Sequence, residues 1–151
     1  MRIYLPATLD ELGSATFTLA ARRAHAVTPA LRAAIPDEDD EGLEFLAQLA
    51  AADDSLVLLA DRPDAPRLRV VVSVDVPERA VVTVVDEDVV PSAVDLLDDL
   101  GRDDVACVHV DEPAAREDVR RAADGDEAAL DALDERDLLW YDASELGRIP
   151  R

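Results

Sequence analysis

The spacing of apolar side chains along the chain predicts one long helix. Between residues 39 and 60 an apolar side chain recurs every three or four positions, which is the spacing of an amphipathic helix. We expect this stripe to pack inward, and its members are Phe45, Leu49, Ala52, Leu56 and Leu59, broadened by Leu43 and Leu46.

Short runs rich in β-branched and aliphatic residues predict strands. They lie near residues 2–5, 24–28, 68–76, 80–86, 105–110 and 138–142. The link Pro77-Glu78-Arg79 is short enough to favour an antiparallel hairpin between the third and fourth of these runs. Both runs are apolar at most positions, so we expect them to lie inside the sheet.

Two stretches begin with residues typical of a helix start. Thr8 and Glu11 have the spacing of a capping box, and Gly13 can end that helix early. Thr28 before Pro29 places a capping side chain ahead of a proline at the first helical position, where no amide hydrogen bond is lost.

Further helices are predicted at residues 92–101, 113–123 and 126–134, the last two with thin apolar stripes that suit the surface. This order of elements predicts an α+β (mixed α/β) fold, with a single mixed sheet of about five or six strands covered by helices. The sheet includes the central antiparallel hairpin of residues 68–76 and 80–86. Because no low-complexity linker divides the chain, we expect residues 1–151 to form a single domain.

The chain is strongly acidic. Its 35 Asp and Glu residues face 15 basic residues, all of them arginine, which gives a formal net charge of -20. GC-rich codon usage explains the missing lysines, and adaptation to high salt is the alternative. A surface of this sign repels phosphate backbones, so we do not expect the protein to bind nucleic acid.

Targeting signals are not predicted. The stretch MRIYLPATLDEL has too short an apolar run for a signal peptide, and no apolar stretch approaches the ~20 residues of a membrane helix. One cysteine, Cys107, excludes an internal disulfide. We therefore expect a cytoplasmic protein without a membrane partner, and the pattern does not define its oligomeric state.

Few residues point to catalysis. None of the five glycines belongs to a phosphate-binding loop, and the acidic run at 37–41 lacks calcium-loop spacing, so we expect no cofactor and no metal. A thiol, an imidazole and a carboxylate share one strand face at Cys107, His109 and Asp111, which suggests a nucleophile set. Neighbours on that face lie about 6.5–7 Å apart, too far for direct hydrogen bonding. The alternative is a buried cysteine that packs as a small apolar side chain.

The segment RRAHAVTPALR, residues 22–32, is free of acids in an acidic chain. Arginines beside a helix start suit an anion, and histidine adds a group that titrates near neutral pH. We therefore take Arg22, Arg23, His25 and Arg32 as candidate ligand-binding residues. The competing interpretation is that these arginines pair with the protein's own carboxylates, including the acidic run that follows.

Four stretches carry a resemblance that spans nearly the whole chain: MRIYLPATLDEL, AHAVTPALR, VVVSVDVP and LLWYDASEL. With the long helix that starts in acidic residues, they are similar to a family of small uncharacterised proteins, a domain of unknown function found mainly in actinobacteria. The resemblance agrees with the GC-rich codon signature. It implies a bacterial, cytoplasmic protein and supplies no activity or site residue.

Three functions fit these observations. The first, which we favour, is a non-catalytic binding or regulatory module that engages a protein or a small anionic ligand through the acid-free segment. The second is an enzyme that uses Cys107, His109 or an acidic cluster. The third is an acidic decoy that mimics nucleic acid and occupies a basic partner.

Overall fold

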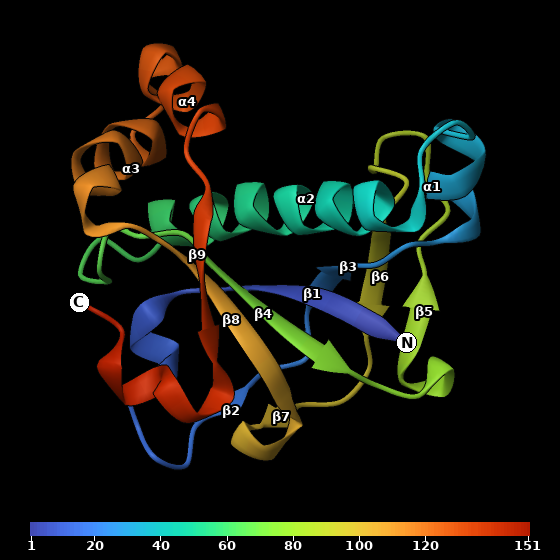
Figure 1. Cartoon of the computed structure of the whole chain (residues 1–151), viewed down its shortest axis with the longest axis horizontal. Coiled ribbons are helices and arrows are strands. Elements are labelled where there is room, and N and C mark those ends of the chain that lie inside the picture. The colour runs from blue at the N-terminus through green and yellow to red at the C-terminus, as the bar shows by residue number, and fades with distance from the viewer.

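The computed structural model describes all residues, 1–151, and is built on a seven-stranded antiparallel sheet (Figure 1). The strand order is β5-β6-β3-β1-β4-β8-β9. These strands are β1 (Arg2–Ala7), β3 (Arg23–His25), β4 (Val70–Asp75), β5 (Val81–Thr83), β6 (Ala93–Leu96), β8 (Val105–Asp111) and β9 (Leu138–Asp142). A second sheet pairs β2 (Thr18–Leu19) with β7 (Leu100–Gly101).

Helices lie on both sides of the main sheet. The α-helices are α1 (Pro29–Ala34), α2 (Asp40–Ala60), α3 (Arg116–Ala123) and α4 (Glu127–Asp134). Short 3-10 helices are η1 (Leu9–Leu12), η2 (Glu78–Ala80), η3 (Arg102–Asp104), η4 (Pro113–Ala115) and η5 (Ala143–Arg148). In Figure 1, α2 crosses above the sheet, and β2, β7 and η5 lie below it. None of the helices combines the length and apolar character needed to cross a membrane.

Each strand serves two layers, because neighbouring side chains point to opposite faces. The face away from α2 carries the main core, where Ile3 and Leu5 of β1 pack with Val72 of β4. On the opposite face, Tyr4 and Val71 pack against Ala47 and other small residues of α2. The small side chains let the helix lie close to the strands.

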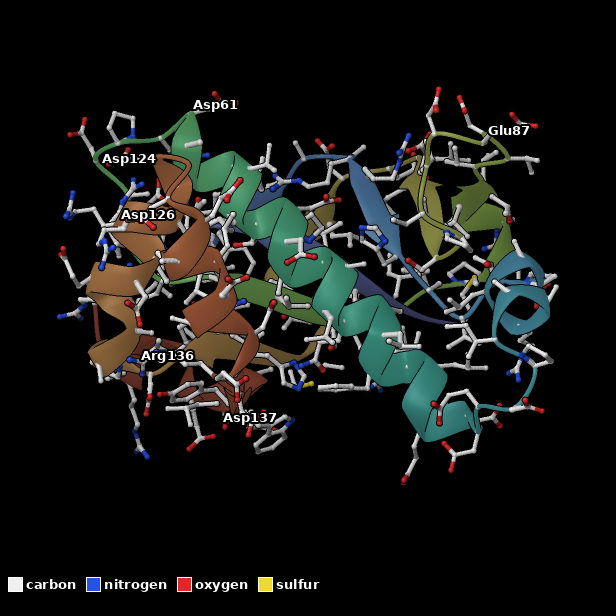
Figure 2. The ribbon with its side chains drawn as sticks, turned by 90° about the horizontal axis from the view of Figure 1, so that it is seen from above. Asp61, Glu87, Asp124, Asp126, Arg136 and Asp137 are labelled. Carbon is white, nitrogen blue, oxygen red and sulfur yellow. The ribbon has the colours of Figure 1, made fainter.

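The α2 helix covers only part of its sheet face. It contacts β1, β3 and β4, and it crosses the strands diagonally, with α3 and α4 beside one end and α1 beside the other (Figure 2). Leu56 and Leu59 at its C-terminal end pack with Val119 of α3 and Leu133 of α4. The sheet face beside α2, over β8 and β9, is therefore left open.

The α+β class is confirmed, and so are the long helix and most of the predicted strands. Thr28 caps α1 as predicted, with its Oγ1 accepting a hydrogen bond from the Leu31 amide at 3.0 Å. The sheet differs from the prediction in being wholly antiparallel and in having seven strands.

The predicted central hairpin is wrong. β4 pairs with β1 and β8, whereas β5 pairs only with β6 and forms an edge of the sheet. The η2 turn carries the chain away from β4, and the side chains of β5 are largely exposed. A short link between two apolar runs therefore did not determine which strands pair.

The predicted helix at residues 92–101 is also wrong, because this segment forms β6 and β7. Ala93 to Leu96 fill the gap between β3 and β5, with Val94 and Leu96 in the main core. Here the hydrogen bonds of two neighbouring strands outweigh local helix-start signals.

The inward stripe of α2 is confirmed in part, because Leu43, Ala52, Leu56 and Leu59 are buried as predicted. Ala47 and Ala51 are also buried, whereas Phe45 is 51% exposed and Leu49 is 39% exposed. The smaller side chains face the sheet, and these two larger ones stand at the side of the helix.

Candidate functional site

Arg22 is held inside the protein. Its guanidinium donates to Glu11 Oε1 at 2.7 Å and to the backbone oxygens of Pro6 and Ala20 at 3.1 and 3.0 Å. Glu11 also accepts a hydrogen bond from the Thr8 amide at 2.8 Å. Burial alone would raise the pKa of Glu11, but the hydrogen bonds from Arg22 and Thr8 outweigh it and hold the pKa below its usual value.

Arg23 and Arg32 pair with carboxylates nearer the surface. Arg23 lies opposite Asp95 of β6 and donates to it at 2.6 Å, and this hydrogen bond to Asp95 raises the pKa of Arg23. Arg32 donates to Asp40 in the first turn of α2 at 2.7 Å. Both pairs are substantially exposed, so each contributes little to stability.

His25 is buried and joins a hydrogen-bonded chain whose Asp54 end is exposed. Its Nδ1 lies 2.8 Å from Ser92 Oγ, and its Nε2 lies 2.8 Å from Asp54 Oδ2. A serine, a histidine and a carboxylate in contact resemble a hydrolytic triad in composition. Ser92 is only 3% exposed and His25 2%, and neither residue lines a pocket from which a substrate could reach the hydroxyl. The chain links α2 to β3 and to the segment before β6.

The four predicted site residues do not converge on one cavity. Arg22 lies on the side of η1, Arg23 and His25 face the side of α2, and Arg32 belongs to α1. Each has a carboxylate partner within the protein. This arrangement matches the interpretation in which the segment neutralises the protein's own acids.

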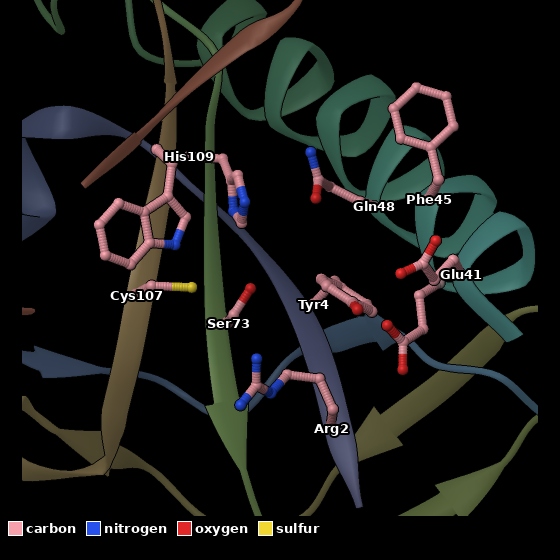
Figure 3. Close-up of a pocket in the computed structure, with 10 residues that line it drawn as sticks. Arg2, Tyr4, Glu41, Phe45, Gln48, Ser73, Cys107 and His109 are labelled. Atoms are coloured by element: carbon pink, nitrogen blue, oxygen red, sulfur yellow. The ribbon is translucent and has the colours of Figure 1, made fainter. Parts of the chain in front are cut away.

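A different group of residues surrounds a pocket on the open part of the sheet, which we call the sheet pocket (Figure 3). Its volume is about 280 Å³. The strands supply its floor through Arg2, Tyr4, Ser73, Cys107, His109 and Trp140. The α2 helix supplies its wall through Glu41, Glu44, Phe45 and Gln48.

Strand register brings the floor residues together. Tyr4 lies opposite Ser73, and Ser73 lies opposite Cys107, in a row across β1, β4 and β8. His109 lies opposite Trp140 of β9 in the next row. Because these rows alternate with core-facing positions, the polar side chains gather on the face beside α2.

A β-bulge helps to build this floor. Ser73 pairs with Cys107, but Val74 pairs with Val105, so Ala106 is an extra residue in β8. The extra residue turns Val105 into the main core while Cys107 stays on the floor of the pocket. Without the bulge, both side chains would point to the same face.

Two polar atoms of the floor have no hydrogen-bond partner in the protein. They are Ser73 Oγ and His109 Nδ1, and Ser73 is fully buried. In Figure 3 the Ser73 hydroxyl points to the space between Tyr4 and His109. A buried hydroxyl without a hydrogen-bond partner lowers the stability of the fold by about 1–3 kcal/mol. A polar group that enters the pocket would form hydrogen bonds with these atoms and remove that penalty.

His109 and Tyr4 of the floor are neutral at pH 7. Burial, with a smaller contribution from Arg2, lowers the pKa of His109, so its imidazole offers one donor and one acceptor. Burial and the nearby Glu44 raise the pKa of Tyr4 to about 12, so its phenol keeps its proton. Arg2 is engaged with Asp75 through two hydrogen bonds of 2.8 Å, and the hydrogen bond from Arg2 lowers the pKa of Asp75.

The nucleophile set suggested by the sequence is not assembled. Cys107 and His109 line the same pocket, as their spacing predicted, but no hydrogen bond joins them, and His109 Nδ1 has no partner. Asp111 is committed to Arg69 through two hydrogen bonds of 2.9 and 2.8 Å, and both side chains are buried. Asp111 therefore links the start of β4 to β8 and does not orient the imidazole of His109.

Sequence reasoning missed most of the sheet pocket. Ser73 carries a signal in the sequence, because it is the single polar residue within the apolar run Val70–Val74. Trp140 is the single tryptophan of the chain and lies on an edge strand, where it is 59% exposed. The wall residues have no such signal, because their position depends on how α2 crosses the sheet.

Comparison with known proteins gives the chain a family and no activity. No curated protein and no solved structure shows significant similarity to it. A model of a family of unknown function, DUF6912, matches residues 1–149, and the chain therefore belongs to that family.

Proposed function

We propose that this protein is a non-catalytic binding module whose ligand occupies the sheet pocket. The observation that carries the proposal is the fully buried, unpartnered Ser73 hydroxyl at the floor of an open pocket. Native proteins seldom leave such a group unsatisfied, and a bound polar ligand would supply the missing partner.

The form of the pocket supports a small ligand. Its volume of about 280 Å³ lies just below the usual range of about 300–1,000 Å³ for small-molecule sites, so the ligand must be small. Phe45 and Trp140 are half-exposed aromatic side chains that line it, where they offer apolar faces to a bound ligand. The β-bulge beside Ser73 is the kind of irregularity that sets side chains at functional positions.

The proposal moves the ligand away from the acid-free segment, since the arginines there already hold carboxylates. The proposed role is still binding or regulation. The ligand is either a small molecule or a chemical group on a protein partner. We further infer a cytoplasmic location, relatives mainly among actinobacteria and a single domain, as the sequence suggests.

A fragment screen observed by NMR tests the proposal. We expect small polar aromatic fragments to shift the single indole N–H signal of Trp140 and the amides of residues 72–74 and 107–109. Shifts confined to Arg22, Arg23 and Arg32 would instead place the ligand at the acid-free segment. A screen with no shifts at the pocket would overturn the proposal.

Two matched variants sharpen this test. Trp140 and Leu139 are neighbours on β9, both are exposed, and they point to opposite faces. Trp140→Ala should weaken binding of each hit, and Leu139→Ala should leave it unchanged. Equal losses in the two variants would mean that β9 as a whole was disturbed.

A further inference from the structure

The sheet pocket has acceptors and aromatic faces where a ligand would lie, and few free positive charges. We propose that it takes a planar organic cation, a guanidinium or an amidinium group. This inference rests on the proposed binding function and names the chemical class of the ligand. It differs from the anion that the arginines of the sequence suggested.

Charge at the pocket favours a cation. Glu41 and Glu44 stand on the wall, and neither forms an ion pair within the protein. The one cationic side chain of the pocket, Arg2, already binds Asp75 in a bidentate pair. The carboxylates therefore have no positive partner, while the guanidinium of Arg2 has its negative one.

The aromatic side chains favour a flat group. Trp140 comes from β9 on one side of the pocket, and Phe45 comes from α2 on the other. Figure 3 shows Phe45 and Gln48 on the helix above the strand residues. Planar cations gain from contact with aromatic faces, most strongly with tryptophan.

The floor then offers acceptors to N–H groups. Ser73 Oγ is fully buried and unpartnered, and the unpartnered Nδ1 of neutral His109 accepts in the tautomer that carries its proton on Nε2. A guanidinium or an amidinium carries several N–H donors in one plane and no acceptor. Such a group can reach the floor with its donors while the carboxylates of the wall balance its charge.

Three isosteric probes test the charge directly. Benzamidine, benzamide and benzoate share one shape and carry a positive charge, no charge and a negative charge at pH 7. We expect benzamidine to bind at the sheet pocket at least about tenfold more tightly than benzamide, with benzoate weakest. Titrations followed by NMR at low ionic strength measure all three.

Charge-removing variants locate the effect. Glu41→Gln with Glu44→Gln should weaken benzamidine roughly fivefold and leave benzamide unchanged. The matched control is Glu78→Gln with Glu87→Gln, which removes the same charge near the opposite edge of the sheet, where Figure 2 labels Glu87. If the control weakens benzamidine equally, the net charge of the protein is responsible, and the inference fails.

The source of the cation is distinguished by a second pair of probes. N-acetylarginine amide represents the side chain of a protein partner, and N-acetylcitrulline amide is its neutral counterpart. Selective binding of the arginine compound supports a partner chain that inserts an arginine. Binding of benzamidine alone supports a free small molecule, and the same cation chemistry holds in both cases.

The same measurements distinguish a failure of the cation class from a failure of the binding function. If polar fragments bind the pocket but benzamide or benzoate equals benzamidine, the cation class is overturned and the binding function stands. If neither the fragments nor any of these probes shifts the Trp140 signal, the pocket is no binding site and both proposals fail.

Discussion

Arg22 and Arg23 are adjacent in the chain, yet only one of them holds a buried carboxylate. The side chains of Arg22 and Glu11 are 18% and 12% exposed, whereas those of Arg23 and Asp95 are 39% and 49% exposed. Arg22→Ala should lower the free energy of unfolding by about 2 kcal/mol, because Glu11 loses its closest cation and keeps the Thr8 amide and, at 3.7 Å, Arg62. Arg23→Ala should lower it by less than about 1 kcal/mol. Urea denaturation followed by circular dichroism measures both, and equal losses would contradict this prediction.

Acid should reduce the loss in Arg22→Ala. The folded pKa of Glu11 lies below its ordinary value of 4.5, so its pairing stabilises the fold above that pH. The contribution disappears as pH falls through the folded pKa. The difference between wild type and Arg22→Ala should therefore shrink below about pH 4.5.

His109 gives a second pH effect in a higher range. Its folded pKa lies below the ordinary 6.5, so the unfolded chain takes up its proton first as pH falls. The wild type should lose stability below pH 6.5 more steeply than His109→Gln, which has no such group. Melting temperatures of both proteins between pH 7.5 and 5 test this, and parallel curves would show that His109 titrates normally.

Single residues show how far the candidate site could be predicted. The shared face of Cys107 and His109 followed from strand alternation alone and is confirmed. The partners of Arg22 and His25 did not follow, because Glu11 and Asp54 approach them only once the sheet and α2 are assembled. Candidate chemistry was thus recognisable, while its use depended on tertiary contacts.

Among the elements, the start of α1 is set by local sequence, because Thr28 caps the helix and Pro29 occupies its first position. Thr28 accepts from the Leu31 amide and also donates to the Pro91 carbonyl, so one hydroxyl fastens the helix start to another segment. Thr28→Ala should cost about 1–2 kcal/mol of unfolding free energy. Thr28→Ser keeps the hydroxyl and should recover most of it. Thermal unfolding checks the pair, and a serine variant as weak as alanine would show that the methyl group matters instead.

Segments whose state depends on neighbours were harder to predict. Residues 92–101 combine a serine start with leucines and a glycine end, which is a helix pattern, but the sheet needs a strand between β3 and β5. In α2 the period was correct and most of the predicted stripe is buried, but Phe45 and Leu49 lie to the side. Element type followed from local pattern wherever an element was long or well capped.

In the whole molecule, the positive charges are mostly neutralised by ion pairs and the negative charges are not. Its arginines are mostly paired, and many of its 35 acids have no cationic partner. Mutual repulsion of these acids opposes folding at low ionic strength, and salt screens it. The melting temperature should therefore rise when NaCl increases from about 0.05 to 0.5 M, where the Debye length shortens from above 10 Å to below 5 Å. A fall in melting temperature would show that salt weakens the ion pairs more than the repulsion.

At this scale the fold class was predictable and the topology was not. Alternating patterns identify strands, but they do not say that β1 lies between β3 and β4. The wrong hairpin has the same origin. Nearness in sequence favoured the pairing of β4 with β5, whereas β4 pairs with the apolar strands β1 and β8.

The central place of β1 also shapes how the chain reaches its fold. β1 spans residues 2–7 and pairs with residues 70–75, which then pair with residues 105–111. One edge of β1 can pair with β3 soon after synthesis, but its other edge must wait for β4, which is made much later. Such distant pairings raise the contact order and slow folding, so nascent β1 stays open to misassociation until β4 has emerged.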